Sequence, residues 1–98
     1  MSIASFNDFM KLDIRVGKIT RAEPFPEARK PAFKLWVDMG SDLGEKKSSA
    51  QITTHYNPDQ LIGKPVMSEI LVLGVPDADG EVVLIVPDHD VPLGGRLF

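Results

Sequence analysis

A strict alternation of side-chain types over residues 33–40 constrains the fold more than any other feature of this 98-residue sequence. One set is apolar and the other is mostly charged: Phe33, Leu35, Val37 and Met39 against Lys34, Trp36 and Asp38. Because successive side chains of a β-strand point to opposite faces, the pattern predicts a strand with one buried face and one outer face. Trp36 is expected on the outer face.

Four further strands are predicted. Three are runs rich in apolar and β-branched residues, over residues 13–23, 69–73 and 82–86, and the fourth is a polar strand of lysines, small hydroxyls and an amide, over residues 46–53. Within the first run the alternation breaks at Gly17, and a glycine at such a break predicts a β-bulge. Between the last two runs, Asp79 is followed by Gly80, a pair that is typical of hairpin turns.

Two short helices are also predicted. Ser5 can cap a helix over residues 6–11, with Asp8 placed where a carboxylate favours a helix N-terminus. Asn57 caps a one-turn helix with Pro58 at its first position. Five short strands, with a helix between the third and the fourth, fit an all-β fold: a five-stranded Greek-key barrel of OB type. The competing SH3-like barrel normally lacks that helix.

The length and composition limit the classes of protein that the chain can belong to. A chain of this length is expected to form a single OB-fold domain over residues 1–98. The net charge is -3 and the pI about 5.2, whereas dedicated nucleic-acid binders are usually basic, so RNA binding would need a local basic patch. The absence of cysteine excludes disulfides and thiolate metal sites. No signal peptide or membrane-spanning run is apparent, so we expect a cytoplasmic protein without membrane insertion.

Several segments, taken in order along the chain, resemble one known family. They are DIRVGKI, FPEARKPAFKLWVDMG, SSAQIT, YNPDQLIGK, MSEILVLG and VVLIVPDHDVPLGGRL. Together they resemble the tRNA-binding-domain family, and within it most closely the CsaA-type chaperones, which are stand-alone homodimers associated with protein export. The resemblance implies an OB barrel, dimerisation through N- and C-terminal extensions, and binding of unfolded or pre-secretory polypeptide. Related domains of the family bind tRNA.

One departure from the family lies between Lys64 and Pro65. In the family, the corresponding glycine and lysine are followed by another apolar strand and by a loop of the type NFPPR. Losing this stretch, roughly a dozen residues or more, would leave backbone groups of the neighbouring strands unpaired. Either this protein lacks the strand and loop, or the encoded chain contains residues there that this sequence does not. The basic residue of that loop has no counterpart here, which weakens the case for RNA.

The candidate ligand-binding residues are polar, basic or aromatic side chains on and after the second and third predicted strands: Lys34, Trp36, Lys46, Lys47, Ser49, Gln51, Thr53, Lys64 and Ser68. OB folds typically bind ligands on these two strands. An outer Trp36 could pack on a peptide side chain or stack on a base, unless a terminal extension or a partner subunit covers it. The hydroxyls and amide of the third strand suit peptide or sugar contacts equally well, and the alternative is a solvated polar face.

Apolar residues near both ends of the chain are the candidate dimer contacts: Phe6, Phe9, Met10, Leu97 and Phe98. The first three fall on one side of the predicted N-terminal helix. So short a helix is unstable alone and must dock on another surface, which a second copy of the chain can provide.

Catalytic chemistry has little support in the sequence. The Asp88, His89 and Asp90 run lies in a turn region with no third nitrogen or sulfur ligand nearby. No nucleophile elbow or phosphate-binding glycine loop is present. We therefore predict no enzyme activity, no metal site and no cofactor. A small hydrolase that uses His55 or His89 is the weakest alternative.

The sequence as a whole predicts an ATP-independent, export-related chaperone that binds unfolded or pre-secretory polypeptides. It is expected to act as a cytoplasmic homodimer. The alternative function is that of a stand-alone tRNA-binding module, with tRNA as the partner.

Overall fold

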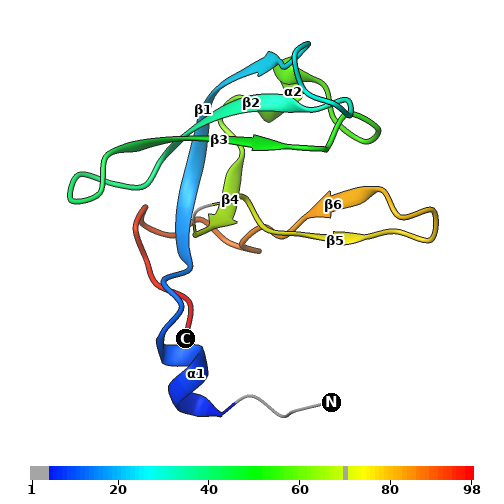
Figure 1. Cartoon of the computed structure of the whole chain (residues 1–98). Helices are drawn as coiled ribbons and strands as arrows, with labels where there is room; N and C mark the ends of the chain where they lie inside the picture. The colour runs from blue at the N-terminus through cyan, green and yellow to red at the C-terminus, as the bar shows by residue number, and fades with distance from the viewer. Residues whose placement is uncertain (1–4, 70) are drawn as a thin grey trace.

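The computed structural model describes residues 5–69 and 71–98. Its elements, in chain order, are α1 (Phe6–Met10), β1 (Arg15–Pro24), β2 (Phe33–Asp38), β3 (Glu45–Ala50), α2 (Pro58–Leu61), β4 (Pro65–Ser68), β5 (Gly74–Pro76) and β6 (Val82–Leu84). Strands β1 to β4 form one curled antiparallel sheet in the order β3-β2-β1-β4, and β5 pairs with β6 (Figure 1). An arrangement of three consecutive antiparallel strands in which the fourth strand returns to lie beside the first is a Greek key. The predicted all-β architecture of OB type is therefore confirmed.

The core lies on the concave face of the curled sheet. The alternation of β2 is confirmed, since Phe33, Leu35 and Val37 are buried while Trp36 is only half-buried. The largest fully buried side chains come from both the sheet and its connections: Ile19, Leu35, Val37, Ile52, Leu61 and Val66. Burying each such side chain stabilises the fold by about 1.5–3 kcal/mol. The helix α2 packs against β1 and places Leu61 in this core.

The bulge that was expected at Gly17 lies instead at Thr20. The register between β1 and β2 is regular up to Ile19 and shifts before Arg21. Gly17 has a different role, because a Cβ atom there would lie 2.5 Å from Val37 Cγ1 and 2.6 Å from Met39 Sδ. Only a glycine allows β1 to approach these two core side chains so closely.

The bounds of the last strands differ from the prediction. The expected strand over residues 69–73 is not formed in the described part of the chain: the Glu69 N–H donates to the Leu71 carbonyl at 3.2 Å, which makes a tight turn. Ile70 lies outside the described residues. The strand β4 forms earlier, because the residues that directly follow Lys64 reach the unpaired edge of β1. The predicted third strand also ends early, at Ala50.

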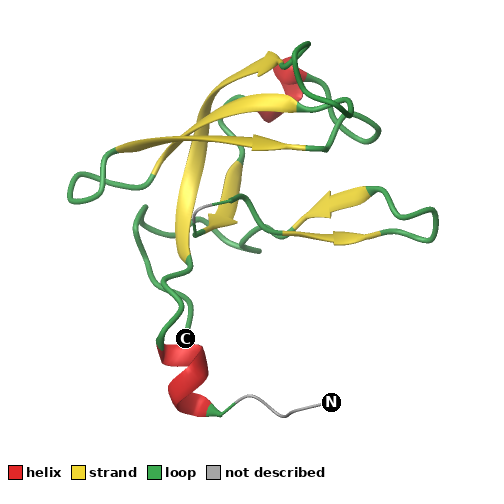
Figure 2. Ribbon diagram, in the orientation of Figure 1, coloured by secondary structure: helices red, strands yellow, loops and turns green. Residues whose placement is uncertain are grey.

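The hairpin predicted from Asp79 and Gly80 is confirmed as β5 and β6 (Figure 2). Gly80 has a φ of +84°, which favours glycine. The Asp77 Oδ1 atom accepts hydrogen bonds from the N–H groups of Asp79 and Glu81, at 2.9 and 3.0 Å. A side-chain oxygen that satisfies backbone donors in this way stabilises a tight turn.

Both helices begin with the capping residue that the sequence predicted, and in each the cap is part of a capping box. In α1 the Ser5 hydroxyl accepts from the Asp8 N–H, and the Asp8 carboxylate accepts from the Ser5 N–H. The second of these bonds is the main reason that the pKa of Asp8 lies below its usual value. In α2 the same exchange joins Asn57 and Gln60.

The C-terminal segment pairs with the start of β1, where β2 does not reach. The Gly94 N–H donates to the Val16 carbonyl at 2.8 Å, and the Val16 N–H donates to the Gly95 carbonyl at 2.9 Å. The Leu97 N–H then donates to the Ile14 carbonyl at 2.7 Å. These bonds bring the end of the chain next to α1, away from the sheet (Figure 1).

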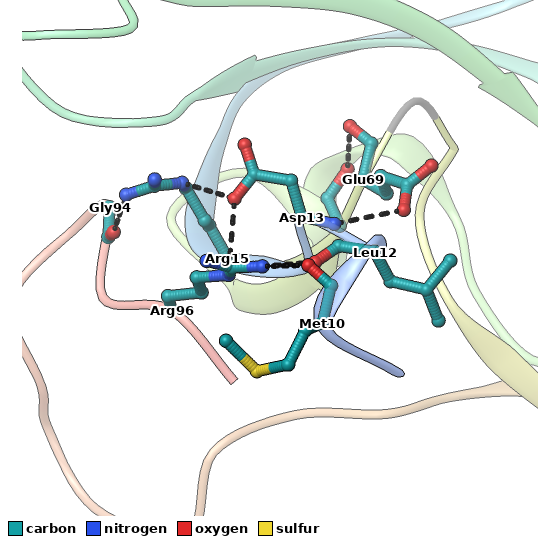
Figure 3. A network of polar contacts seen from close by, with 8 residues as sticks. Met10, Leu12, Asp13, Arg15, Glu69, Gly94 and Arg96 are labelled. Atoms are coloured by element: carbon teal, nitrogen blue, oxygen red, sulfur yellow. Dashed lines mark hydrogen bonds and ion pairs between the residues drawn. The ribbon is translucent and has the colours of Figure 1, made fainter. Parts of the chain in front are cut away.

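Two arginines hold the C-terminal segment next to α1 and to the start of β1 (Figure 3). The Arg96 guanidinium donates to the carbonyls of Met10 and Leu12, at 2.8 and 2.7 Å. Arg15 donates to the Gly94 carbonyl at 2.9 Å and to the Asp13 carboxylate at 2.8 Å. The ends of the chain are therefore held together by charged side chains that bind main-chain oxygens.

Candidate functional site

The outer face of β1, β2 and β3 carries a row of two cations and one aromatic ring. Trp36 is paired with Arg21 on one side and with Lys47 on the other. The Arg21 guanidinium carbon lies 4.5 Å from the centroid of the Trp36 ring, and the Lys47 Nζ atom lies 5.3 Å from it. Both distances are typical of cation–π contacts. The expected outward position of Trp36 is thus confirmed, and neighbouring strands cover part of its ring.

A second row of the same face brings two more of the candidate residues together. Lys34 is paired with Ser49, and its Nζ atom lies 4.9 Å from the centroid of the Phe25 ring. Lys34, Trp36, Lys47 and Ser49 therefore form one continuous surface, as the pairing of β2 with β3 requires. This surface carries two lysines, and Glu23 lies beside it, opposite Lys34 and in an ion pair with Arg21.

A groove runs along the edge of β3 that faces away from β2. Its main part has a volume of about 640 Å³, with an apolar lining from three segments: Phe25, Ala32, Ile52, Leu71, Val72 and Val82. A second cavity of about 430 Å³ adjoins it and shares the residues Phe25, Ser49 and Leu71. We call this combined hollow the β3 groove. Its rim carries four cations: Arg29, Lys30, Lys34 and Lys47.

Ser49 and Gln51 both line the β3 groove. Thr53 is not among the residues that line the groove, and it lines a neighbouring hollow of about 330 Å³ together with Gln51.

Three further candidates lie elsewhere. Lys46 borders a separate cavity of about 330 Å³ with Met39. The Lys64 Nζ atom lies 5.7 Å from the centroid of the Tyr56 ring. Ser68 is only 4% exposed and its hydroxyl is 3.3 Å from the Leu71 carbonyl oxygen, so it is occupied within its own turn. The structure does not bring these three residues to the groove.

Sequence reasoning missed two apolar residues of the β3 groove, Phe25 and Leu71, which line both of its cavities. Phe25 did carry a signal, since it stands between Pro24 and Pro26 in a loop that should be stiff. Leu71 carried no signal, because its exposure depends on the turn that follows β4.

Polar pairs hold the hairpin that forms the far wall of the groove. His55 Nε2 lies 2.6 Å from Asp77 Oδ2, and the Thr54 hydroxyl donates to Glu81 at 2.8 Å. The hydrogen bond with His55 is the main reason that the pKa of Asp77 lies below its usual value. This pairing gives His55 a structural role, whereas His89 lies in an exposed turn, 3.5 Å from Asp88.

Within residues 5–69 and 71–98, no cluster of three or more histidine, cysteine, aspartate or glutamate side chains is arranged to hold a metal ion. None of the helices in this part of the chain has the length and apolar character needed to cross a membrane.

The candidate dimer residues form an exposed apolar surface at the ends of the chain. Phe6 is 74% exposed and the C-terminal Phe98 is fully exposed, with Met10 and Leu97 also exposed. Phe9 is half-buried. The network around Arg96 keeps these side chains on one part of the molecule.

Comparison with known proteins places these features in context. No family model matches the chain. Among curated proteins, it is 35% identical over 107 aligned positions to a methionine–tRNA ligase of Porphyromonas gingivalis and 32% identical over 111 positions to that of Methanococcus aeolicus. These matches use 95% and 99% of this chain but only 15% and 16% of the ligases. Since both alignments exceed 98 positions, the ligases contain residues without a counterpart here, as expected if the family's strand and loop are absent after Lys64.

Solved structures give a closer match over whole chains. The chaperone CsaA of Bacillus anthracis has a TM-score of 0.89 and 46% identity, and the alignment covers 99% of this chain and all of that one. The CsaA chaperone of Picrophilus torridus gives 0.88 and 42%, covering 98% and 100%. A MetRS-related protein of Pyrococcus horikoshii gives 0.83 and 26%, covering both chains fully. On this identity, coverage and shared fold, the chain belongs to the CsaA chaperone family.

Proposed function

We propose that this protein is an ATP-independent chaperone that binds unfolded or pre-secretory polypeptides in the β3 groove. The observation that carries the proposal is the apolar groove itself, which lies open between β3 and the segment from Leu71 to Val82. Apolar pockets with a few polar groups at their margins are the usual binding sites of proteins. The chaperones of Bacillus anthracis and Picrophilus torridus, which share the fold, support the same reading.

The shape of the groove suits an extended chain better than a compact ligand. Its two cavities follow the direction of β3, and the shared residues Phe25 and Leu71 connect them. Leu71 is 58% exposed, although it is a large apolar side chain. An exposed apolar strip of this kind is typical of a protein-binding surface. The cations on the rim favour polypeptides that carry acidic side chains near their apolar ones. The proposed activity needs no cofactor and belongs in the cytoplasm.

The proposal is tested with an unfolded, carboxymethylated model protein, titrated at two salt concentrations. Binding should persist at the higher salt, because apolar contacts are little screened by ions. The variant Leu71→Ser should weaken binding several-fold. Val75→Ser is the matched control, since Val75 is similarly exposed at 51% but does not line the groove. Absence of binding by the wild-type protein, or equal losses in both variants, would contradict the proposal.

We also propose that the protein is a homodimer joined through its terminal segments. Phe6 is 74% exposed and Phe98 is fully exposed, and burying each side chain would contribute about 1.5–3 kcal/mol. Sedimentation equilibrium should then give about twice the chain mass of 10.8 kDa. The double variant with Phe6→Ser and Phe98→Ser should sediment as a monomer while its circular dichroism stays unchanged. A wild-type monomer at micromolar concentration would exclude this arrangement.

A second candidate function, tRNA binding, is favoured by one observation: the row of Arg21, Trp36 and Lys47 on the outer face. Cations beside an aromatic ring suit the backbone and bases of single-stranded nucleic acid. The ligases and the MetRS-related protein point the same way by name. Titration with bulk tRNA decides between the two functions, since RNA affinity should fall steeply with salt. Strong, salt-sensitive tRNA binding without polypeptide binding would reverse our ranking.

A further inference from the structure

The strand β3 forms one end of the curled sheet. It pairs with β2 over its whole length, from Glu45 to Ala50, and the sheet order places no strand on its other side. Among the described residues, no backbone hydrogen bond joins residues 45–53 to any segment other than β2. The free edge of β3 therefore presents a row of unpaired N–H and carbonyl groups.

The register shows which residues supply these groups. In an antiparallel pair, opposite residues alternate between those that exchange hydrogen bonds and those that do not. The Met39 N–H donates to the Gly44 carbonyl at 2.9 Å, which fixes the phase of this alternation. The N–H and carbonyl groups of Lys47 and Ser49 must then point away from β2, toward the β3 groove.

The walls of the groove complement this edge. Apolar side chains from the loop after β1 and from the hairpin side face it, chiefly Phe25, Leu71 and Val82. The Ser48 hydroxyl, which lines the smaller cavity, is buried and has no hydrogen-bond partner in the described part of the chain. A buried hydroxyl without a partner is costly, so a polar group of a bound chain would satisfy it.

Charge indicates what kind of strand fits. Two copies of the protein could pair their β3 edges about a two-fold axis at Lys47. Each Lys47 would then lie opposite the Lys47 of the other copy, and like charges directly opposite are destabilising. Edge lysines are a common means of preventing such self-pairing. A different polypeptide fits better if it carries acidic or hydroxyl side chains on one face and apolar side chains on the other. Its polar face would contact the lysines while its apolar face lies in the β3 groove.

We propose that an extended polypeptide adds a strand to the free edge of β3, with main-chain hydrogen bonds to Lys47 and Ser49 and with alternate side chains in the β3 groove. This mode of recognition gives affinity through the backbone and selectivity through alternate side chains. It rests on the proposed chaperone function and specifies how that function would be carried out. A chaperone that reads mainly backbone accepts many sequences.

The probe is a short acetylated peptide in which valine alternates with glutamate and threonine. Two N-methylated forms provide the matched controls, because each blocks the N–H groups of one alternate set of residues. In strand addition only one set faces β3, so one form should lose at least about tenfold in affinity while the other binds nearly as the parent. Equal affinities for both forms would overturn strand addition.

Protein variants test the same contact from the other side. Ser49→Pro removes the free N–H at a position where edge strands tolerate proline, whereas Ser49→Ala removes only the hydroxyl. We expect Ser49→Pro to weaken probe binding about tenfold and Ser49→Ala to change it less than about twofold. Should Ser49→Pro fail to fold, the two N-methylated peptides still decide the matter.

Amide hydrogen exchange gives a direct reading. The N–H groups of Lys47 and Ser49 should become protected when the probe binds. If the unfolded model protein binds but these amides stay unprotected, strand addition fails and the chaperone function stands. If neither the model protein nor the probe binds, the proposed function fails first. Protection that grows with protein concentration without probe would instead show that a second copy fills the edge, which also overturns the proposal.

Discussion

The two edges of the curled sheet differ in how their backbone groups are satisfied. At β4, the Met67 N–H donates to the Ile85 carbonyl and the Met67 carbonyl accepts from the Leu73 N–H. At β3, the corresponding groups of Lys47 and Ser49 have no backbone partner among the described residues. One edge is thus part of the folded core and the other is available to a ligand. The comparison shows that the backbone groups of one edge are satisfied within the fold, while those of the other edge have no backbone partner among the described residues, and it is at this second edge that we propose a polypeptide binds.

The largest expected effect comes from placing proline at each edge in turn. Met67→Pro should lower the free energy of unfolding by about 3–5 kcal/mol, because it deletes a buried side chain and leaves the Ile85 carbonyl unpaired. Lys47→Pro should cost less than about 1 kcal/mol, because the N–H that it removes faces the groove. Urea unfolding monitored by circular dichroism measures both changes.

Met67→Leu is the control for side-chain volume and should cost less than about 1.5 kcal/mol. If Lys47→Pro is as destabilising as Met67→Pro, β3 is paired in solution. That result would also be expected if the encoded protein contains further residues after Lys64 that close the barrel.

A smaller effect is expected where β1 crosses the core between the two edges. Gly17→Ala should destabilise the protein by about 1–3 kcal/mol, because the added methyl group overlaps Val37 and Met39. Gly95→Ala is the matched control, since its added Cβ would lie 3.4 Å from the nearest atom and 4.0 Å from Val16. It should change the unfolding free energy by less than about 0.5 kcal/mol. If urea unfolding showed the same loss of unfolding free energy for Gly17→Ala and Gly95→Ala, the core around Gly17 would be less tightly packed than the structure indicates.

The parts of the fold that the sequence could predict were those determined by local patterns. Alternation in β2, the capping residues Ser5 and Asn57, and the hairpin turn at Gly80 are all local patterns, and each is confirmed. Local patterns have local physical causes: side-chain period, orphan N–H groups and positive φ. They therefore need no knowledge of the tertiary fold.

The site was only partly predictable, because it depends on contacts between distant segments. Alternation alone places Lys34 and Trp36 on the outer face of β2, whereas their apposition to Ser49 and Lys47 also needs the pairing of β2 with β3. The groove follows from neither, since Phe25 and Leu71 come together only when the loop after β1 meets the turn after β4. The start of β4 and the bulge at Thr20 likewise depend on how the strands pair with one another. The amino-acid composition does not reveal this pairing.

The C-terminal segment that covers the start of β1 should open more easily than either edge. Arg96→Lys replaces a guanidinium that reaches the carbonyls of Met10 and Leu12 with a single ammonium group. Exchange of the Phe9 and Leu12 amides should accelerate about tenfold, while amides of β2 should not change. Lys11→Ala, which removes only an exposed ion pair with Asp8, is the control and should have little effect. Unchanged exchange in Arg96→Lys would show that main-chain pairing alone holds α1.

The smallest effect concerns the hairpin wall of the open edge, which His55 and Asp77 help to hold. Because folding lowers the pKa of Asp77, the unfolded chain binds a proton more readily than the folded one. The stabilising contribution is fully present above the ordinary aspartate pKa of about 4 and is lost as pH falls through the lower folded pKa. An NMR titration of the Asp79 and Glu81 amides, which donate to Asp77, should show this step below about pH 4. The step should vanish in Asp77→Asn and persist in Asp79→Asn. If Asp77→Asn keeps the acid step and leaves peptide binding unaltered, the wall is held without this pair, and the open edge owes its shape to apolar packing alone.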